Sequence, residues 1–199
     1  MKKRFAATAA LSLTAILTLA GCSGTGGSGS MPGMDHGSGA TTTQSPAADA
    51  SDADVMFVMM MIPHHQQAVE MSDTLLSKSG VDERVVALAE QIKAAQQPEI
   101  DRMEGWLRDR GMSMDGMGDM EHGGGMMSAS DMEALEAAEG LDASRLFLEQ
   151  MIEHHRGAVE MAQDEVNEGQ NTDVVDLART IVESQMEEIA TMEYLLATM

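Results

Sequence analysis

The chain contains an internal repeat, and this repeat constrains the fold more than any other feature of the sequence. Residues 57–71 return ninety positions later as residues 147–161, and nine of the fifteen positions are identical. A second segment, residues 85–107, returns as residues 174–196 with an offset of 89. Because each unit holds two segments and is used twice, we expect two copies of one supersecondary element packed against each other.

Each repeated segment has the spacing of an amphipathic helix. Val85, Leu88 and Ile92 follow one another at intervals of three and four residues, which places them on one helical face. No stretch alternates apolar and polar residues with the period of a strand. Residues able to cap helices stand where the segments begin, namely Ser51 or Asp52, Asp82, Asp142, and Asn171 or Thr172. These patterns predict an all-α fold, a four-helix bundle made of two repeated helical hairpins.

Composition sets the expected boundaries of this bundle. Residues 1–21 combine a basic start with an apolar stretch that is short for a bilayer span, as is typical of a secretory signal peptide. Residues 22–51 are rich in Gly, Ser, Thr and Ala, and we expect a disordered, flexible tether there. The expected parts of the bundle, residues 52–199, are repeat one at 52–111, a Met/Gly-rich linker at 112–129 and repeat two at 130–199. Within repeat two, Ser130 and Gly140 can bracket a short extra helix.

The signal segment ends in Leu19-Ala20-Gly21-Cys22, which resembles the lipobox of bacterial lipoproteins. The resemblance implies that Cys22 becomes the new N-terminus and carries a lipid. The protein would then be anchored at the extracytoplasmic face of the cell membrane. Cys22 is the only cysteine, so an intrachain disulfide and a cysteine-ligated zinc site are both excluded.

The net charge and the methionine content indicate which kinds of partner this chain can bind. The chain has 12 Lys and Arg against 33 Asp and Glu, and three of the basic residues lie in the signal segment, which leaves a net charge of −24 outside it. We therefore predict no nucleic-acid partner, since nucleic acid is a polyanion, and we expect cations instead. Methionine makes up 21 of the 199 residues. It serves either as adaptable core filler or as a soft ligand for metal.

Polar residues interrupt the apolar face of every expected helix. In the first and third helices, paired histidines follow methionine at helical spacing, and in the second and fourth helices Gln and Glu stand between apolar residues. The polar residues and the methionines near them are Met61, His64, His65 and Met71; Met151, His154, His155 and Met161; Gln96, Glu99 and Met103; and Gln185, Glu188 and Met192. A neutral polar group buried without a partner costs about 2–7 kcal/mol, and a charge costs more. Either these groups hydrogen-bond one another or they bind a cation, and their recurrence in both repeats favours the cation.

The ligand types indicate copper. Di-iron bundles use a Glu-x-x-His pair, whereas here Met61 and Met151 stand three residues before a histidine, in the place of that Glu. Thioether with imidazole suits copper, with Cu(I) favouring Met and Cu(II) favouring His and carboxylate. Glu99 and Glu188 still offer ligands for a hard ion, so iron is less favoured and stays an alternative.

The linker holds a second group of candidate ligands. Six methionines and one histidine lie within sixteen residues, namely Met112, Met114, Met117, Met120, His122, Met126 and Met127. We expect a segment this rich in glycine to be unable to bury these side chains in a core. The linker is therefore predicted to capture a soft metal ion.

The paired motifs resemble those of the bacterial domain-of-unknown-function family 305. The resemblance is carried by His-His-x-x-Ala-Val-Glu-Met at residues 64–71 and 154–161, and by Gln-x-x-Glu-Ile-x-x-Met at residues 96–103 and 185–192. It extends over residues 52–199. It implies a ferritin-like bundle and, because the family includes a periplasmic copper-binding protein, copper bound by the histidines and methionines of the first and third helices.

The sequence thus predicts a lipid-anchored, extracytoplasmic protein that binds Cu(I), Cu(II) or both, and that sequesters or transfers copper. It predicts no catalytic residue, so we expect a binding protein and not an enzyme. One alternative is a ferritin-like iron oxidase or storage protein in which Glu99 and Glu188 bridge two ions beside His64 and His154. A second is a structural helical module whose polar core fixes the register. The sequence identifies no protein that delivers copper, and it leaves a homo-oligomer open.

Overall fold

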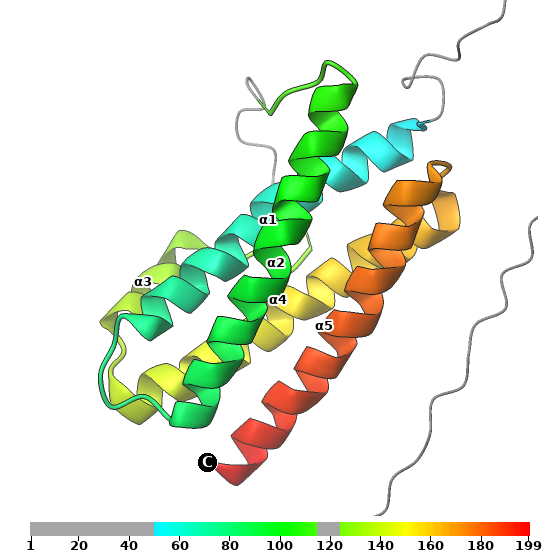
Figure 1. Ribbon diagram of the computed structural model, residues 1–199. Coiled ribbons are helices and arrows are strands. Elements are labelled where there is room, and N and C mark those ends of the chain that lie inside the picture. The colour runs from blue at the N-terminus through cyan, green and yellow to red at the C-terminus, as the bar shows by residue number, and fades with distance from the viewer. Residues whose placement is uncertain (1–49, 115–123) are drawn as a thin grey trace, which may run out of the picture. The chain divides into compact units, whose positions relative to one another are not determined.

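The computed structural model describes residues 50–114 and 124–199, and all regular secondary structure in these ranges is α-helical. The helices are α1 (Asp52–Leu76), α2 (Glu83–Asp109), α3 (Ala129–Ala137), α4 (Gly140–Glu168) and α5 (Thr172–Thr198) (Figure 1). The predicted all-α bundle of two helical hairpins is confirmed. The expected signal peptide, Cys22 and nearly all of the tether lie outside the described residues.

Side-chain caps explain where most of the helices begin. The Ser51 side chain accepts a hydrogen bond from the Asp54 backbone N–H at 3.2 Å, and the Asp54 carboxylate accepts one in return from Ser51. Such a reciprocal capping box satisfies backbone donors that the helix leaves free. Asp82 and Asn171 cap α2 and α5 in a simpler way, since each side chain accepts one backbone N–H. These three caps are among those predicted.

Two predicted helix starts are wrong. The helix α4 begins at Gly140 with Glu139 at the cap position and no side-chain cap bond, so Asp142 lies in its first turn. The short extra helix exists, but Ser128 caps it and not Ser130. The reason is that Ser128 forms a capping box with Asp131, three residues further on. As a result, α3 starts one residue inside the expected linker.

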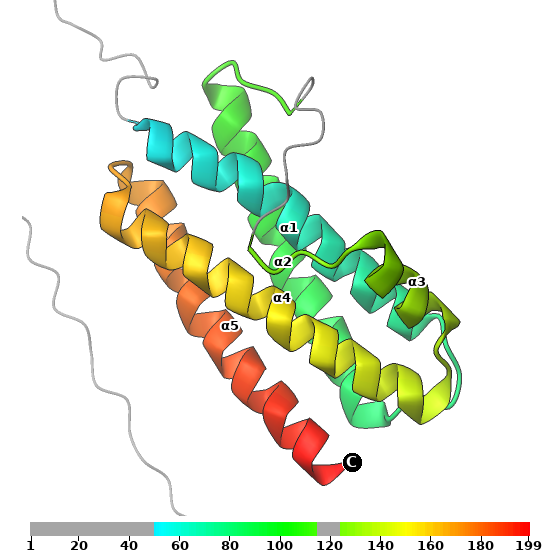
Figure 2. The same cartoon turned by 180° about the vertical axis from the view of Figure 1, so that it is seen from behind.

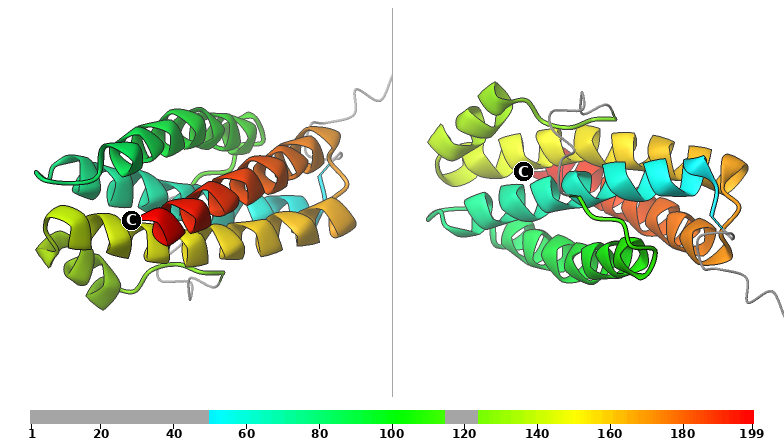
Figure 3. Two further views of the ribbon diagram at one scale, coloured as in Figure 1. Left: turned by 90° about the horizontal axis from the view of Figure 1, so that it is seen from below. Right: turned by 90° about the horizontal axis from the view of Figure 1, so that it is seen from above.

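The two hairpins meet through their first helices. The helix α1 packs along α2, α4 packs along α5, and α1 packs on α4, whereas α2 and α5 touch only slightly. Views from below and above show each hairpin as a closely packed pair (Figure 3). The short α3 lies against α1 and α4 near one end of the bundle (Figure 2). None of the described helices is long and apolar enough to cross a membrane.

The apolar core is divided into two clusters by a layer of polar side chains. Core A consists of Ala68, Met71, Leu75, Val85, Leu88, Ala89, Ile92, Leu135, Ala143, Phe147, Leu148, Met151, Ile152, Met192 and Leu195. Core B consists of Phe57, Val58, Met61, Ile62, Ile100, Met103, Leu107, Ala158, Ala162, Val174, Leu177, Ala178 and Ile181. Along each long helix, polar residues stand between these two sets. This polar layer consists of His64, His65, Gln96, Glu99, His154, His155, Gln185 and Glu188.

The polar layer lies at the centre of the pseudo-twofold symmetry. Met61 of repeat one belongs to core B, and its counterpart Met151 belongs to core A. Met103 and Met192 are divided between the two cores in the same way. Exchanging the repeats therefore exchanges the cores and leaves the layer in place, so both hairpins contribute equivalent residues to it.

Two carboxyl groups, those of Asp54 and Glu165, are buried outside this layer. Glu165 of α4 is only 2% exposed, and its counterpart in repeat one is the apolar Leu75. Burial, followed by the neighbouring carboxyl group of Asp54, raises the pKa of Glu165 from 4.5 to about 8. Burial would also raise the pKa of Asp54, but hydrogen bonds from Ser51 and Asn171 lower it below its ordinary value. Of this pair, Glu165 therefore carries the proton.

We predict that Glu165→Leu stabilises the metal-free protein, and more so at pH 8 than at pH 5. The folded protein holds the Glu165 proton up to a pH of about 8, whereas the unfolded chain releases it near 4.5. Wild type should therefore lose stability as the pH rises through this window, and the leucine variant should not. We expect a gain of roughly 1–3 kcal/mol at pH 8.

Urea unfolding at both pH values checks this prediction. Glu149→Gln is the matched control, because it removes a carboxylate that lies on the exposed face of the same helix and does not contribute to the raised pKa of Glu165. The two unfolding free energies of the control should differ between pH 5 and pH 8 as those of wild type do. An equal gain from Glu165→Leu at both pH values would contradict the assignment of the proton.

Candidate metal centre

Two pairs of histidines face each other across the interface between α1 and α4. His64 and His154 bring their ring centroids to 3.7 Å, with the ring planes inclined by 38°. His155 lies beside His154, with 6.2 Å between the ring centroids. All four imidazoles in the layer are at most 1% exposed. The spacing of the two motifs thus places imidazoles from both repeats in one buried cluster.

The outer histidine of each pair is hydrogen-bonded to a carboxylate. His65 Nε2 lies 2.8 Å from Glu99 Oε2, and the second repeat reproduces this contact between His155 Nε2 and Glu188 Oε2 at 2.6 Å. An ionised carboxylate can only accept, so each of these Nε2 atoms carries the proton. The layer therefore contains the hydrogen bonds between histidine and glutamate that could satisfy these groups without a cation.

The inner histidines differ from each other. His64 Nε2 donates to the carbonyl oxygen of Gly124 at 2.9 Å, whereas neither ring nitrogen of His154 makes a well-formed hydrogen bond to a described residue. The Nδ1 atoms of His64, His65 and His155 also lack such a partner. Metal-binding histidines typically donate one ring N–H to an oxygen and offer the other nitrogen to the metal. Three of the four imidazoles are oriented in this way.

The environment keeps the inner imidazoles neutral. Burial lowers the pKa of His64 from 6.5 to about 3, although the Gly124 carbonyl opposes this and the neighbouring His65 adds to it. Burial and the adjacent His64 hold the pKa of His154 well below its ordinary value. A nitrogen must be deprotonated before it can bind a metal, and at neutral pH both inner rings already meet this condition.

The glutamines of the layer have no partners in the described part of the chain. Gln96 and Gln185 are each 2% exposed, and neither the oxygen nor the nitrogen of their side-chain amides is hydrogen-bonded. Each unsatisfied buried polar group costs about 1–3 kcal/mol. The layer therefore contains buried amide groups and ring nitrogens that its own side chains do not hydrogen-bond.

The carboxylates are not arranged as the iron alternative requires. That alternative places Glu99 and Glu188 beside His64 and His154, but each carboxylate is instead bonded to the outer histidine of its own repeat. Within residues 50–114 and 124–199, no three His, Cys, Asp or Glu side chains form a group able to hold a metal ion.

The predicted methionine ligands lie on both sides of the layer. Met61, Met71, Met103, Met151 and Met192 are at most 1% exposed, and Met161 is half-buried against core B. Met61 and Met151 each precede an inner histidine by three residues, so sulfur and imidazole share one helical face. The structure thus places thioethers next to the histidine cluster from both repeats.

The linker methionines correct one expectation. Met112 and Met114 pack against core B and Met127 packs against core A, although the glycine content of the linker argued against any such packing. Both described ends of the linker, the one that follows α2 and the one that precedes α3, therefore pack on the bundle. Met126 is half-buried as well. Met117, Met120 and His122 lie outside the described residues, so their predicted role as ligands stays a prediction.

A short backbone segment, which we call the strap (residues 124–127), covers the histidine cluster. The Gln67 amide donates to the Met127 carbonyl at 2.9 Å and accepts from the Met127 N–H at 2.7 Å. At the equivalent position of repeat two stands Gly157, where an added Cβ would lie 1.7 Å from the Gly124 oxygen. Sequence reasoning missed the strap, although the mismatch between Gln67 and Gly157 in otherwise similar motifs was a signal.

Comparisons with known proteins agree with this architecture. The model of a family described as a domain of unknown function, DUF305, matches residues 54–196. A DUF305 fragment from Deinococcus radiodurans is 34% identical, with a TM-score of 0.70 over 75% of this chain and 99% of that one. A DUF305 protein from Streptomyces coelicolor is 36% identical, with a TM-score of 0.69 over 73% and 93%.

A third similar structure carries copper. CopM in its Cu(II)-bound form is 32% identical, with a TM-score of 0.64 over 73% of this chain and 96% of that one. CopM is also known in Cu(I)-bound, Ag-bound and apo forms. No curated protein matches the chain.

We predict that Gly157→Ala displaces the strap. The new methyl group would collide with the Gly124 and Gly125 backbone, and a helix cannot yield there without losing its own packing. The Met127 amide, which Gln67 now protects, should exchange with solvent at least about tenfold faster. Hydrogen exchange followed by NMR measures this directly.

Gly105→Ala is the matched control, because Gly105 also lies inside a long helix and has nothing within 4 Å of an added Cβ. That change should stabilise the protein by about 0.5–1 kcal/mol and leave Met127 protected. Unchanged protection of Met127 in Gly157→Ala would show that the strap does not depend on this close approach.

Proposed function

The chain belongs to the DUF305 family, and from this premise we propose that it is an extracytoplasmic, lipid-anchored copper-binding protein that sequesters or transfers copper. The observation that carries the proposal is the buried histidine cluster. Three of its imidazoles donate Nε2–H to an oxygen and leave Nδ1 free, between thioethers of both repeats. The similarity to CopM, which has been solved with Cu(I), Cu(II) and Ag bound, supports the choice of metal.

The donor set suits copper in both oxidation states. Neutral imidazole binds Cu(I) and Cu(II), and thioether sulfur adds a preference for Cu(I). His64 and His154 face each other from α1 and α4, and Met61 and Met151 precede them by one helical turn. Under this proposal Glu99 and Glu188 orient the outer imidazoles and are not the main ligands.

Further parts of the proposal rest on sequence. Lipidation of Cys22 would hold the bundle at the outer face of the membrane, and the tether would let it reach a partner. The linker methionines would capture Cu(I) near the strap. The protein is proposed to act by binding, without catalysis and without nucleic acid. A partner that delivers copper and a homo-oligomeric state are compatible with this role.

We predict that His64→Leu/His154→Leu weakens Cu(I) binding by about 100-fold or more, because it removes two facing ligands. Leucine fills a similar volume, so the metal-free variant should remain folded. Copper at a hundredfold excess over its dissociation constant should stabilise wild type by roughly 2.7 kcal/mol, and this stabilisation should be lost from the variant. Competition with a chromophoric Cu(I) chelator, together with thermal unfolding, checks both statements.

Gln96→Leu/Gln185→Leu is the matched control. These residues are equally buried, equivalent by symmetry and in the same layer, but an amide is a poor ligand for copper. The control should keep its affinity for Cu(I) and gain stability, because it removes four unsatisfied polar atoms. If the histidine variant binds copper as tightly as the control does, the histidine cluster is not the site.

Iron separates this proposal from the oxidase alternative. We predict that Fe(II) in excess does not displace Cu(I) and is not oxidised faster than in buffer alone, because thioethers gain little from a hard ion. Iron oxidation in air, followed by absorbance, measures the second point. If the protein takes up iron first and accelerates its oxidation, and Glu99→Gln/Glu188→Gln abolishes that rate, the oxidase alternative is correct.

A further inference from the structure

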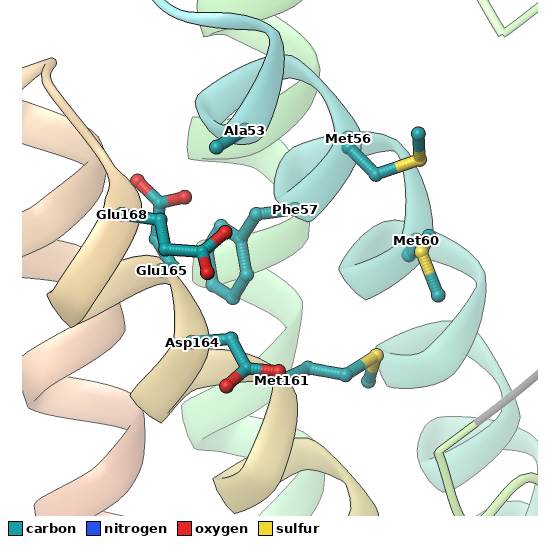
Figure 4. A pocket seen from close by; sticks show the side chains of 8 residues that line it. All are labelled: Ala53, Met56, Phe57, Met60, Met161, Asp164, Glu165 and Glu168. Atoms are coloured by element: carbon teal, nitrogen blue, oxygen red, sulfur yellow. The ribbon is translucent and has the colours of Figure 1, made fainter.

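A pocket of about 230 Å³ opens between the first turns of α1 and the last turns of α4, and no histidine lines it. Three methionines and three acidic residues contribute to its lining, namely Met56, Met60, Met161, Asp164, Glu165 and Glu168 (Figure 4). Of these, only Met161 was a candidate ligand in the sequence. The pocket thus combines soft sulfur donors with negative charge outside the polar layer.

The three thioethers come from two helices. Met56 and Met60 lie one turn apart on α1 and project from the same side of it, while Met161 reaches from α4 towards α1 (Figure 4). Met56 is 53% exposed. Met60 and Met161 are half-buried, so the three methionines range from exposed to half-buried.

Glu165 adds a buried carboxyl group to the lining of the pocket. Its side chain lines the pocket and is 98% buried, as its exposed fraction is 2%. Neither of its carboxyl oxygens makes a well-formed hydrogen bond to a described residue. Burial and the neighbouring carboxyl group of Asp54 raise the pKa of Glu165 to about 8, so at neutral pH Glu165 is protonated and the negative charge of the pocket comes from Asp164 and Glu168.

The symmetry-related groove at the other end of the bundle is lined by different residues. The symmetry counterparts of Met56, Met60, Glu165 and Glu168 are Leu146, Gln150, Leu75 and Lys78. There, Gln150 and Lys78 donate hydrogen bonds to the carbonyl oxygens of Asp131 and Glu136 in α3. The equivalent groove therefore lacks the acidic residues and is covered by α3. In the described part of the chain, no helix covers the pocket.

We propose that this pocket is a second, solvent-open Cu(I) site, in which the thioethers of Met56, Met60 and Met161 bind the ion. Three thioethers match the preference of Cu(I) for soft ligands and low coordination, and the carboxylates of Asp164 and Glu168 at the rim attract cations. The choice of ion rests on the proposed function. The site itself rests on the pocket, its three thioethers and the departure from symmetry.

The test uses the full chain, with Met56→Leu/Met60→Leu as the pocket variant. Met132→Leu/Met186→Leu is the matched control, since it also replaces one half-buried and one exposed methionine but lies outside the pocket. Cu(I) is titrated anaerobically against a chromophoric chelator. In parallel, Ag(I) is titrated into protein labelled with carbon-13 at the methionine methyl groups. We expect the pocket variant to bind one Cu(I) fewer than wild type and the control to bind as many.

The His64→Leu/His154→Leu variant distinguishes the proposed pocket site from the proposed histidine site. It should lose the copper of the histidine cluster while the methyl signals of Met56, Met60 and Met161 still shift on addition of Ag(I). If the pocket variant binds as many Cu(I) ions as wild type, or these methyl signals do not shift, the pocket site is wrong and the histidine site stands. If wild type binds no Cu(I) at all, the proposed function fails as well.

Discussion

The architecture depends on a layer of buried polar groups where the two apolar cores meet. Four imidazoles, two amides and two carboxylates occupy a cross-section that a simpler bundle would fill with leucine. The carboxylates satisfy the outer histidines, and the Gly124 carbonyl satisfies one nitrogen of His64. The remaining nitrogens and both amides have no partner in the described residues. Such a layer lowers the stability of the bare fold, and the fold tolerates it because the cores on either side are continuous and well buried.

The positions where the two repeats differ are as informative as those where they agree. Gln67 and Gly157 are equivalent, yet one hydrogen-bonds the strap and the other makes room for it. Leu75 and Glu165 are equivalent as well, yet one fills core A and the other faces an open pocket. In both cases the change gives one face of the molecule a feature that symmetry alone would not provide. Symmetry therefore explains the bundle, and its exceptions locate the strap and the pocket.

Sequence reasoning predicted what depends on local periodicity. The helices, the hairpin repeat and the histidine layer follow from intervals of three and four residues and from a motif used twice. It failed where distant backbone segments meet: it could not show that Gly124 would accept from His64, or that Met112, Met114 and Met127 would pack on the cores. It also placed the start of α4 at Asp142, because a good capping residue is a local signal and Glu139 makes no side-chain cap bond. Glu165 is buried by Asp54 and by the α4–α5 turn. Because Asp54 is distant in the sequence, no local pattern could predict this burial.

The layer also determines how binding and folding would be coupled. The two hairpins are joined mainly through α1 and α4, since α2 and α5 touch only slightly. His64 and His154 meet across that joint. In the proposed copper-bound form, an ion shared by these two helices would link the hairpins directly and would satisfy nitrogens that now lack partners. Part of the binding free energy would then appear as folding free energy, so copper would tighten the contact between the repeats more than the packing within either hairpin.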